Sequence, residues 1–64
     1  MNKDKNGIIL KEGQEVLVPE PNESDAHKFA FRGFVDSFDG DYVVVVDQDD
    51  DTFMIECERL EVTD

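Results

Sequence analysis

The sequence has few of the residues that small proteins use to staple a fold together. It contains one cysteine, Cys57, one histidine, His27, and no tryptophan in 64 residues. A single cysteine cannot form an internal disulfide, and without more Cys or His a structural zinc site lacks ligands. We therefore expect a fold that is held by packing alone, with no cofactor.

Basic residues and long apolar runs are scarce as well. Six Lys and Arg against 17 Asp and Glu give a formal net charge of −11 at pH 7. Neutralising phosphates requires clustered Lys and Arg, so this charge argues against direct contact with nucleic acid. The early apolar run Ile8–Leu10 is too short for a signal peptide or a membrane span. We expect a cytoplasmic protein that has no membrane partner.

The chain nevertheless contains enough apolar material for one small domain. Apolar residues make up 39% of the sequence and include five Phe. Disordered chains are poor in aromatic and β-branched residues, so the sequence predicts a folded domain, and its length allows only one. We place this domain at residues 13–62. Residues 1–12 form an N-terminal arm that either frays or packs its apolar residues on the domain.

Apolar alternation and turn-forming residues predict short strands and no long helix. The strands are expected at residues 15–18, 29–38, 41–47, 52–57 and 60–62. A helical turn at residues 58–60 leads into the last of them. Asp39-Gly40 between two β-rich segments predicts a hairpin. Gly33 within a strand indicates a bend, a bulge or a close approach of another backbone.

Five strands at this spacing predict an all-β fold in the form of a small, closed or nearly closed barrel. Closure is favoured because a flat sheet of this size would expose two unpaired edges. Alternation places Phe29 on the same strand face as Phe31. The expected core consists of the inward-facing residues Val16, Val18, Phe31, Val35, Val43, Val45, Phe53, Ile55 and Leu60.

Four segments carry a resemblance to a known family. They are Gly13-Gln-Glu-Val-Leu-Val18, Phe31-Arg-Gly-Phe-Val35, Asp39-Gly-Asp-Tyr-Val-Val-Val45 and residues 53–62. Their order resembles the SH3-like small barrel in its Tudor and KOW-type versions, and the chain is similar to short acidic bacterial and phage proteins. The resemblance covers residues 13–62 and implies a five-stranded SH3-like barrel with a short helical turn before the last strand.

The chain departs from both versions of that family in ways that bear on function. KOW-type modules that bind RNA are usually basic, whereas this chain is strongly acidic. Tudor modules read methylated Lys or Arg through an aromatic cage. The residues that could build such a cage here are Phe29, Phe34, Phe38 and Tyr42, and no Trp is present. Ordinary packing of these rings is the competing interpretation.

An exposed aromatic residue is the main candidate for a binding anchor. Phe34 lies on the strand face opposite Phe31 and Val35, and Arg32 projects from the same face as Phe34. Together with nearby acids these residues define the predicted partner-binding surface. Its members are Arg32, Phe34, Asp36, Tyr42, Asp47, Asp49, Asp50 and Asp51.

The acidic run that begins at Asp47 has a second interpretation. Carboxylates at Asp47, Asp49 and Asp51 match part of the spacing of a calcium-binding EF-hand loop. However, Thr52 replaces the glycine that such a loop needs for its sharp turn, and both flanks read as strands. We interpret the run as a solvated turn and predict no metal site, with weak Ca²⁺ or Mg²⁺ binding at these three residues as the alternative.

Three further residues carry chemistry of their own. His27 has Asp25 and Glu23 nearby in sequence, but no nucleophile or phosphate-binding loop accompanies them, so we predict no enzyme activity. Cys57 is expected to be a small core residue whose thiolate is disfavoured by neighbouring acids. Arg59 is expected to form a local surface ion pair with Glu58 or Glu61.

The sequence thus predicts a non-enzymatic protein-interaction module, monomeric, with an acidic surface for a basic protein or peptide. The alternative is a KOW-type accessory of a transcription, translation or other nucleic-acid complex that acts through protein contacts. A third hypothesis, a protein that mimics DNA, requires carboxylates in two ordered rows, and the acids are instead scattered evenly along the chain.

Overall fold

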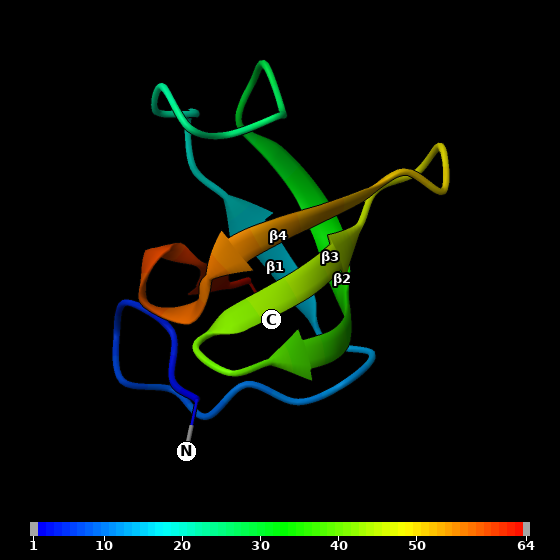
Figure 1. The fold of residues 1–64 in the computed structure, drawn as a ribbon. Helices are drawn as coiled ribbons and strands as arrows, with labels where there is room; N and C mark the ends of the chain where they lie inside the picture. Colours follow the sequence, from blue (N-terminus) through cyan, green and yellow to red (C-terminus); the bar gives the residue numbers. More distant parts are fainter. Residues whose placement is uncertain (1, 64) are drawn as a thin grey trace.

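The structure, a computed structural model, describes residues 2–63. Its elements are β1 (Glu15–Val18), β2 (Phe31–Asp39), β3 (Tyr42–Val46), β4 (Thr52–Glu56), the 3-10 helix η1 (Cys57–Arg59) and β5 (Glu61–Val62). The five strands form one antiparallel sheet in the order β4-β3-β2-β1-β5 (Figure 1). The prediction of a small all-β domain with a helical turn before the last strand is therefore confirmed.

The second strand begins later than the sequence predicts. β1 ends at Val18, whose partner on β2 is Phe31, so the residues before Phe31 have no neighbouring strand to pair with. They belong to the long loop of residues 19–30, and Phe29 is 74% exposed. The prediction that the strand starts at residue 29, with Phe29 on the same strand face as Phe31, is wrong.

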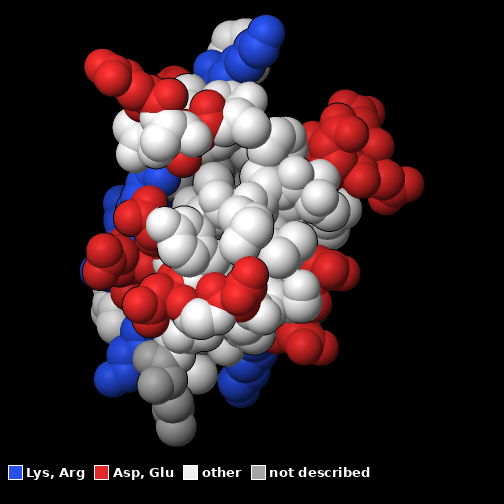
Figure 2. All heavy atoms as spheres, viewed as in Figure 1, with Lys and Arg blue, Asp and Glu red and all other residues white. Residues whose placement is uncertain are grey.

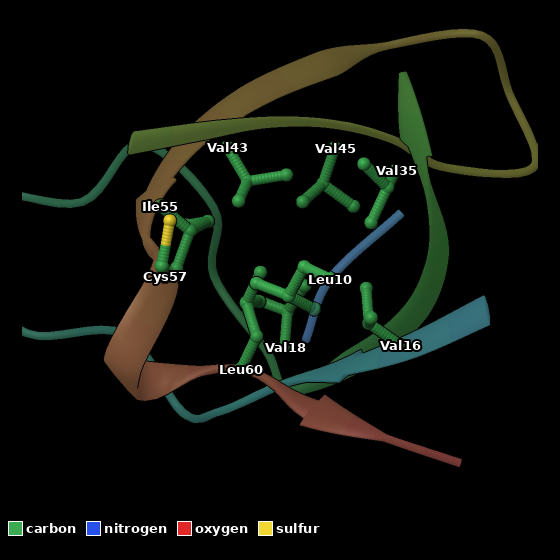
Figure 3. Packing of buried hydrophobic residues seen from close by; sticks show 9 residues of the cluster. All are labelled: Leu10, Val16, Val18, Val35, Val43, Val45, Ile55, Cys57 and Leu60. Atoms are coloured by element: carbon green, nitrogen blue, oxygen red, sulfur yellow. The ribbon is translucent and has the colours of Figure 1, made fainter. Parts of the chain in front are cut away.

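The core is a cluster of nine side chains enclosed by the bent sheet (Figure 3). Its members are Leu10, Val16, Val18, Val35, Val43, Val45, Ile55, Cys57 and Leu60. The sequence places Phe31 and Phe53 in this core, but in the structure both rings are half-buried and pack against its edge. There both rings contact the buried His27 edge-on.

The β2–β3 hairpin turns at Asp39-Gly40, where the sequence predicts a hairpin. Asp39 pairs with Tyr42, which leaves Gly40 and Asp41 as a two-residue turn. Gly40 has a φ of +61°, a conformation that favours glycine at the first position of such a turn. Further along the hairpin the register shifts between Val35 and Ser37, so Asp36 lies in a β-bulge.

Gly33 is a point of close backbone approach, one of the three outcomes that the sequence predicts for it. A Cβ atom at this position would lie 2.6 Å from the Val46 carbonyl oxygen and 2.7 Å from Val45 Cγ1. Both contacts are shorter than ordinary van der Waals distances. Only a residue without a side chain therefore fits between β2 and β3 here.

The N-terminal arm packs on the domain and covers the edge formed by β5. Leu10 inserts into the core, while the Lys5 amide donates to the Leu60 carbonyl at 2.9 Å. The Val62 amide donates to Asp4 Oδ2, also at 2.9 Å. Since Glu61 and Thr63 face β1, these two bonds satisfy backbone groups that point away from the sheet. The arm thus closes one edge of the sheet.

Asp4 is the center of this arrangement and is almost fully buried. Its Oδ1 accepts hydrogen bonds from the amides of Asn6 and Ile8, both at 2.8 Å, in addition to the Val62 bond at Oδ2. Burial by itself raises the pKa of Asp4, but the three amide donors outweigh it and leave the pKa below the ordinary value. Asp4 is therefore a charged link between the arm and β5.

We expect added NaCl to raise the melting temperature. The net charge of −11 is spread over turns and outward strand positions, and salt screens the repulsion among these carboxylates. Thermal unfolding followed by circular dichroism at low and high NaCl measures the effect. A melting temperature that falls with NaCl would show that the favourable ion pairs outweigh the repulsion.

Candidate functional site

The strand register brings several apolar side chains together on the outer face of the sheet. Phe34 on β2 pairs with Val46 on β3, and Val44 pairs with Met54 on β4. Tyr42 lies two residues before Val44, and alternate residues of a strand share a face. Phe34, Tyr42, Val44, Val46 and Met54 therefore form one surface, which we call the outer apolar face.

This face is exposed and has carboxylates around it. Met54 is 50% exposed, Phe34 46% and Tyr42 43%, while the two valines are half-buried. Figure 2 shows an uncharged area over β3 and β4 with acidic side chains at its margins, the largest group at the β3–β4 turn. Exposed apolar patches rimmed by polar groups are typical of interaction sites.

Only some of the predicted site residues lie on the outer apolar face. Phe34 and Tyr42 lie on the same face but toward opposite ends, because four residues of β3, about 13 Å, separate Tyr42 from the partner of Phe34. Asp36 and Arg32 are exposed residues of β2. The sequence reasoning did not include Met54, although the alternation Thr52-x-Met54-x-Glu56 would have indicated an outward side chain.

The four rings proposed for an aromatic cage do not converge. Phe38 is half-buried and packs against the core, and Phe29 lies in the loop of residues 19–30. Phe34 and Tyr42 are on the outer apolar face. The ring contacts within the described residues instead join His27, Phe31 and Phe53.

The acidic turn between β3 and β4 is built around Asp47. Its Oδ1 accepts hydrogen bonds from the amides of Asp49 and Asp51, both at 2.9 Å. Asp50 completes the turn with a φ of +64°. Asp47 therefore organises the loop, and Asp49, Asp50 and Asp51 form its exposed acidic surface. Within residues 2–63, no three His, Cys, Asp or Glu side chains are grouped closely enough to hold a metal ion.

His27 is a buried packing residue with an open pocket beside it. Its Nε2 lies 2.9 Å from the Pro19 carbonyl oxygen, and its ring meets the Phe31 and Phe53 rings edge-on at 5.5 and 5.9 Å. Its Nδ1 is buried without a partner among the described residues. The adjacent pocket has a volume of about 320 Å³ and is lined by Ala26, His27, Lys28, Phe29, Phe31, Asp47 and Phe53.

Arg59 joins the long loop to the end of β4, a contact that the sequence does not predict. Its guanidinium donates to both carboxylate oxygens of Asp25, at 2.7 and 3.1 Å, and to Glu56 at 3.4 Å. The expected pairing with Glu58 or Glu61 is wrong, and Glu61 instead pairs with Lys5 at 3.4 Å. The Asp25 carboxylate therefore binds Arg59, so the grouping of His27 with Asp25 does not form an acid–base pair.

The ion pair between Asp25 and Arg59 should make the free energy of unfolding depend on pH in the acid range. Hydrogen bonds from Arg59, and then from the Asn22 amide, lower the pKa of Asp25 from 3.8 to about 2. A carboxylate with a lowered pKa stabilises the fold above its ordinary pKa, and this contribution is lost as the pH falls toward 2. We expect Asp25→Asn to cost about 1–2 kcal/mol at neutral pH and only a small part of that near pH 2, where about half of the carboxylate is protonated.

Urea unfolding of the wild-type protein and of Asp25→Asn across this pH range measures the difference. Glu23→Gln is the matched control, because it removes a neighbouring exposed carboxylate that makes no ion pair among the described residues. A stability difference that stays constant down to pH 2 would contradict the assignment.

Cys57 is a buried free thiol at the start of η1. Burial raises its pKa, and the nearby carboxylates of Asp41 and Glu58 raise it further. The thiol is therefore held in its unreactive, protonated form, in agreement with the sequence-based interpretation.

The described part of the chain contains no helix with the length and apolar character needed to cross a membrane. No protein-family model, curated protein or solved structure matches the chain.

Proposed function

We propose that the protein is a non-enzymatic interaction module on an SH3-like small barrel, and that it binds a basic protein partner through the outer apolar face. The observation that carries this proposal is the exposed group of Phe34, Tyr42 and Met54 with carboxylates around it (Figure 2). Aromatic and Met side chains are enriched at the centers of interfaces, and charged residues at their rims.

The charge determines the kind of partner. Asp36 is an exposed residue of β2 two positions after Phe34, the exposed carboxylates of Asp49, Asp50 and Asp51 lie in the β3–β4 turn, and the whole chain carries −11. Such a rim attracts a positively charged surface and speeds encounter, while the apolar center contributes most of the affinity. A basic partner therefore satisfies both parts of the surface.

The proposal can be tested by affinity capture from native cell lysate with elution in a NaCl gradient. Wild-type protein should retain a basic protein that NaCl releases, and the double variant Phe34→Ser/Tyr42→Ser should lose it. Ile9→Ser is the control, because Ile9 is an exposed apolar residue of the N-terminal arm and not of the outer apolar face. A partner that resists high NaCl, or that the double variant retains equally, contradicts the proposal.

A further inference from the structure

The two edge strands of the sheet, β5 and β4, differ in whether their outward backbone groups are hydrogen-bonded. At β5 the outward backbone groups of Leu60 and Val62 bond to the N-terminal arm. At the opposite edge, β4 pairs with β3 on one side only. An unpaired edge strand offers a row of backbone donors and acceptors to another chain.

The register shows which groups of β4 point outward. The Cys57 amide donates to the Asp41 carbonyl, and the Asp47 amide donates to the Asp51 carbonyl. In an antiparallel ladder these bonds alternate, so Phe53 and Ile55 also bond to β3. The amides of Thr52, Met54 and Glu56 and the carbonyls of Thr52 and Met54 therefore face away from β3, and within the described residues they have no hydrogen-bond partner, whereas the Glu56 carbonyl begins the 3-10 helix η1.

Open space lies next to this edge. Phe53, the second residue of β4, lines the 320 Å³ pocket together with His27, Phe29 and Phe31. On the other side of the sheet, Met54 belongs to the outer apolar face. A strand added along β4 would place alternate side chains next to the pocket and next to Met54.

We propose that β4 takes up an extended, Lys- or Arg-bearing segment of the partner as an added antiparallel or parallel strand. This inference rests on the proposed function and specifies its binding mode, in which backbone hydrogen bonds supply affinity and alternate side chains supply selectivity. β4 contains no Lys or Arg, and acids lie at both ends, at residues 49–51 and at Glu56 and Glu58. A second copy of the chain is a poor occupant because each copy carries −11.

The probe is a short, end-blocked peptide of alternating Lys and Val, titrated into the full chain and followed by NMR and amide hydrogen exchange. We expect the amides of Thr52, Met54 and Glu56 to become protected. Met54→Pro removes one outward donor without touching the β3 ladder, and should weaken binding about tenfold or more. Met54→Ala keeps the donor and loses only the side chain, so it is the reference variant, and Met54→Pro should bind about tenfold or more weakly than Met54→Ala.

A second probe keeps the test decisive if Met54→Pro does not fold. The same peptide N-methylated along its backbone keeps its charge and side chains but donates no backbone hydrogen bonds, and it should not bind. Equal binding of both peptides, no peptide binding, or unprotected amides in β4 overturns strand addition. A basic, salt-released partner in the capture experiment would then leave the proposed function standing. A dimer of the chain alone that protects the same amides would reassign the edge to self-association.

Discussion

Replacing Asp4 with Asn is expected to lower the free energy of unfolding by about 2–4 kcal/mol. In the wild-type protein one carboxylate accepts hydrogen bonds from the amides of Asn6, Ile8 and Val62. An amide side chain has only one acceptor oxygen, so at least one of these donors would face an NH₂ group. A domain of this size has little stability to spare, and the variant should be largely unfolded at modest urea concentrations.

Urea unfolding followed by circular dichroism measures this loss. Glu12→Gln is the control, because it removes the same charge from an exposed residue of the arm whose side chain makes no hydrogen bond or ion pair among the described residues. It should change the free energy of unfolding by less than about 0.5 kcal/mol in either direction, the usual limit for a surface substitution. Because the pKa of Asp4 lies below its ordinary value, the difference between Asp4→Asn and wild type should shrink as acid protonates the carboxylate. Equal stability of the two variants would mean that the hydrogen bonds of the Asp4 side chain contribute no net stability.

Replacing Gly33 with Ala is the second large effect, with an expected cost of about 3 kcal/mol. The added Cβ would lie 2.6 Å from the carbonyl oxygen of Val46, which is part of the β2–β3 ladder. A backbone atom cannot rotate away as the end of a side chain can, so the two strands must separate locally. The same hairpin carries Phe34 and Tyr42, so the outer apolar face should be disturbed too.

Gly13→Ala is the matched comparison for this substitution. Gly13 has a positive φ but open space around it, so an added methyl group costs only the backbone strain of about 1–2 kcal/mol. Thermal and urea unfolding of the two variants separates crowding from strain. If Gly33→Ala is no less stable than Gly13→Ala, the close approach of β2 and β3 is not limiting.

The strands were predictable because their signals are local. Val16 with Val18 and Val43 with Val45 alternate with outward residues, and Asp39-Gly40 indicates the hairpin between two such runs. These patterns follow directly from the two-residue period of a strand. For the same reason the exposure of Phe34 and Tyr42 could be predicted, since Phe34 lies between the inward positions 33 and 35 and Tyr42 precedes the inward Val43.

The features that sequence reasoning missed depend on partners distant in the chain. Asp4 contacts Val62 and Asp25 contacts Arg59, and nothing in the local sequence of either acid indicates such a partner. His27 is buried because the rings of Phe31 and Phe53 lie against it, whereas its neighbours in sequence are typical of a turn. Only the turn-forming residues Asn6 and Gly7 after Asp4 could have suggested its local hydrogen bonds.

The N-terminal arm also sets a limit on how the chain can assemble. With the β5 edge closed by Asp4 and Lys5, the sheet has one open edge and can therefore add one further strand. Edge-to-edge pairing then stops after a single addition, whereas a sheet with two open edges could join head to tail without end. The arm thus limits the sheet to one added strand: the edge at β4 stays open, while the covered edge at β5 prevents the chains from joining into fibres.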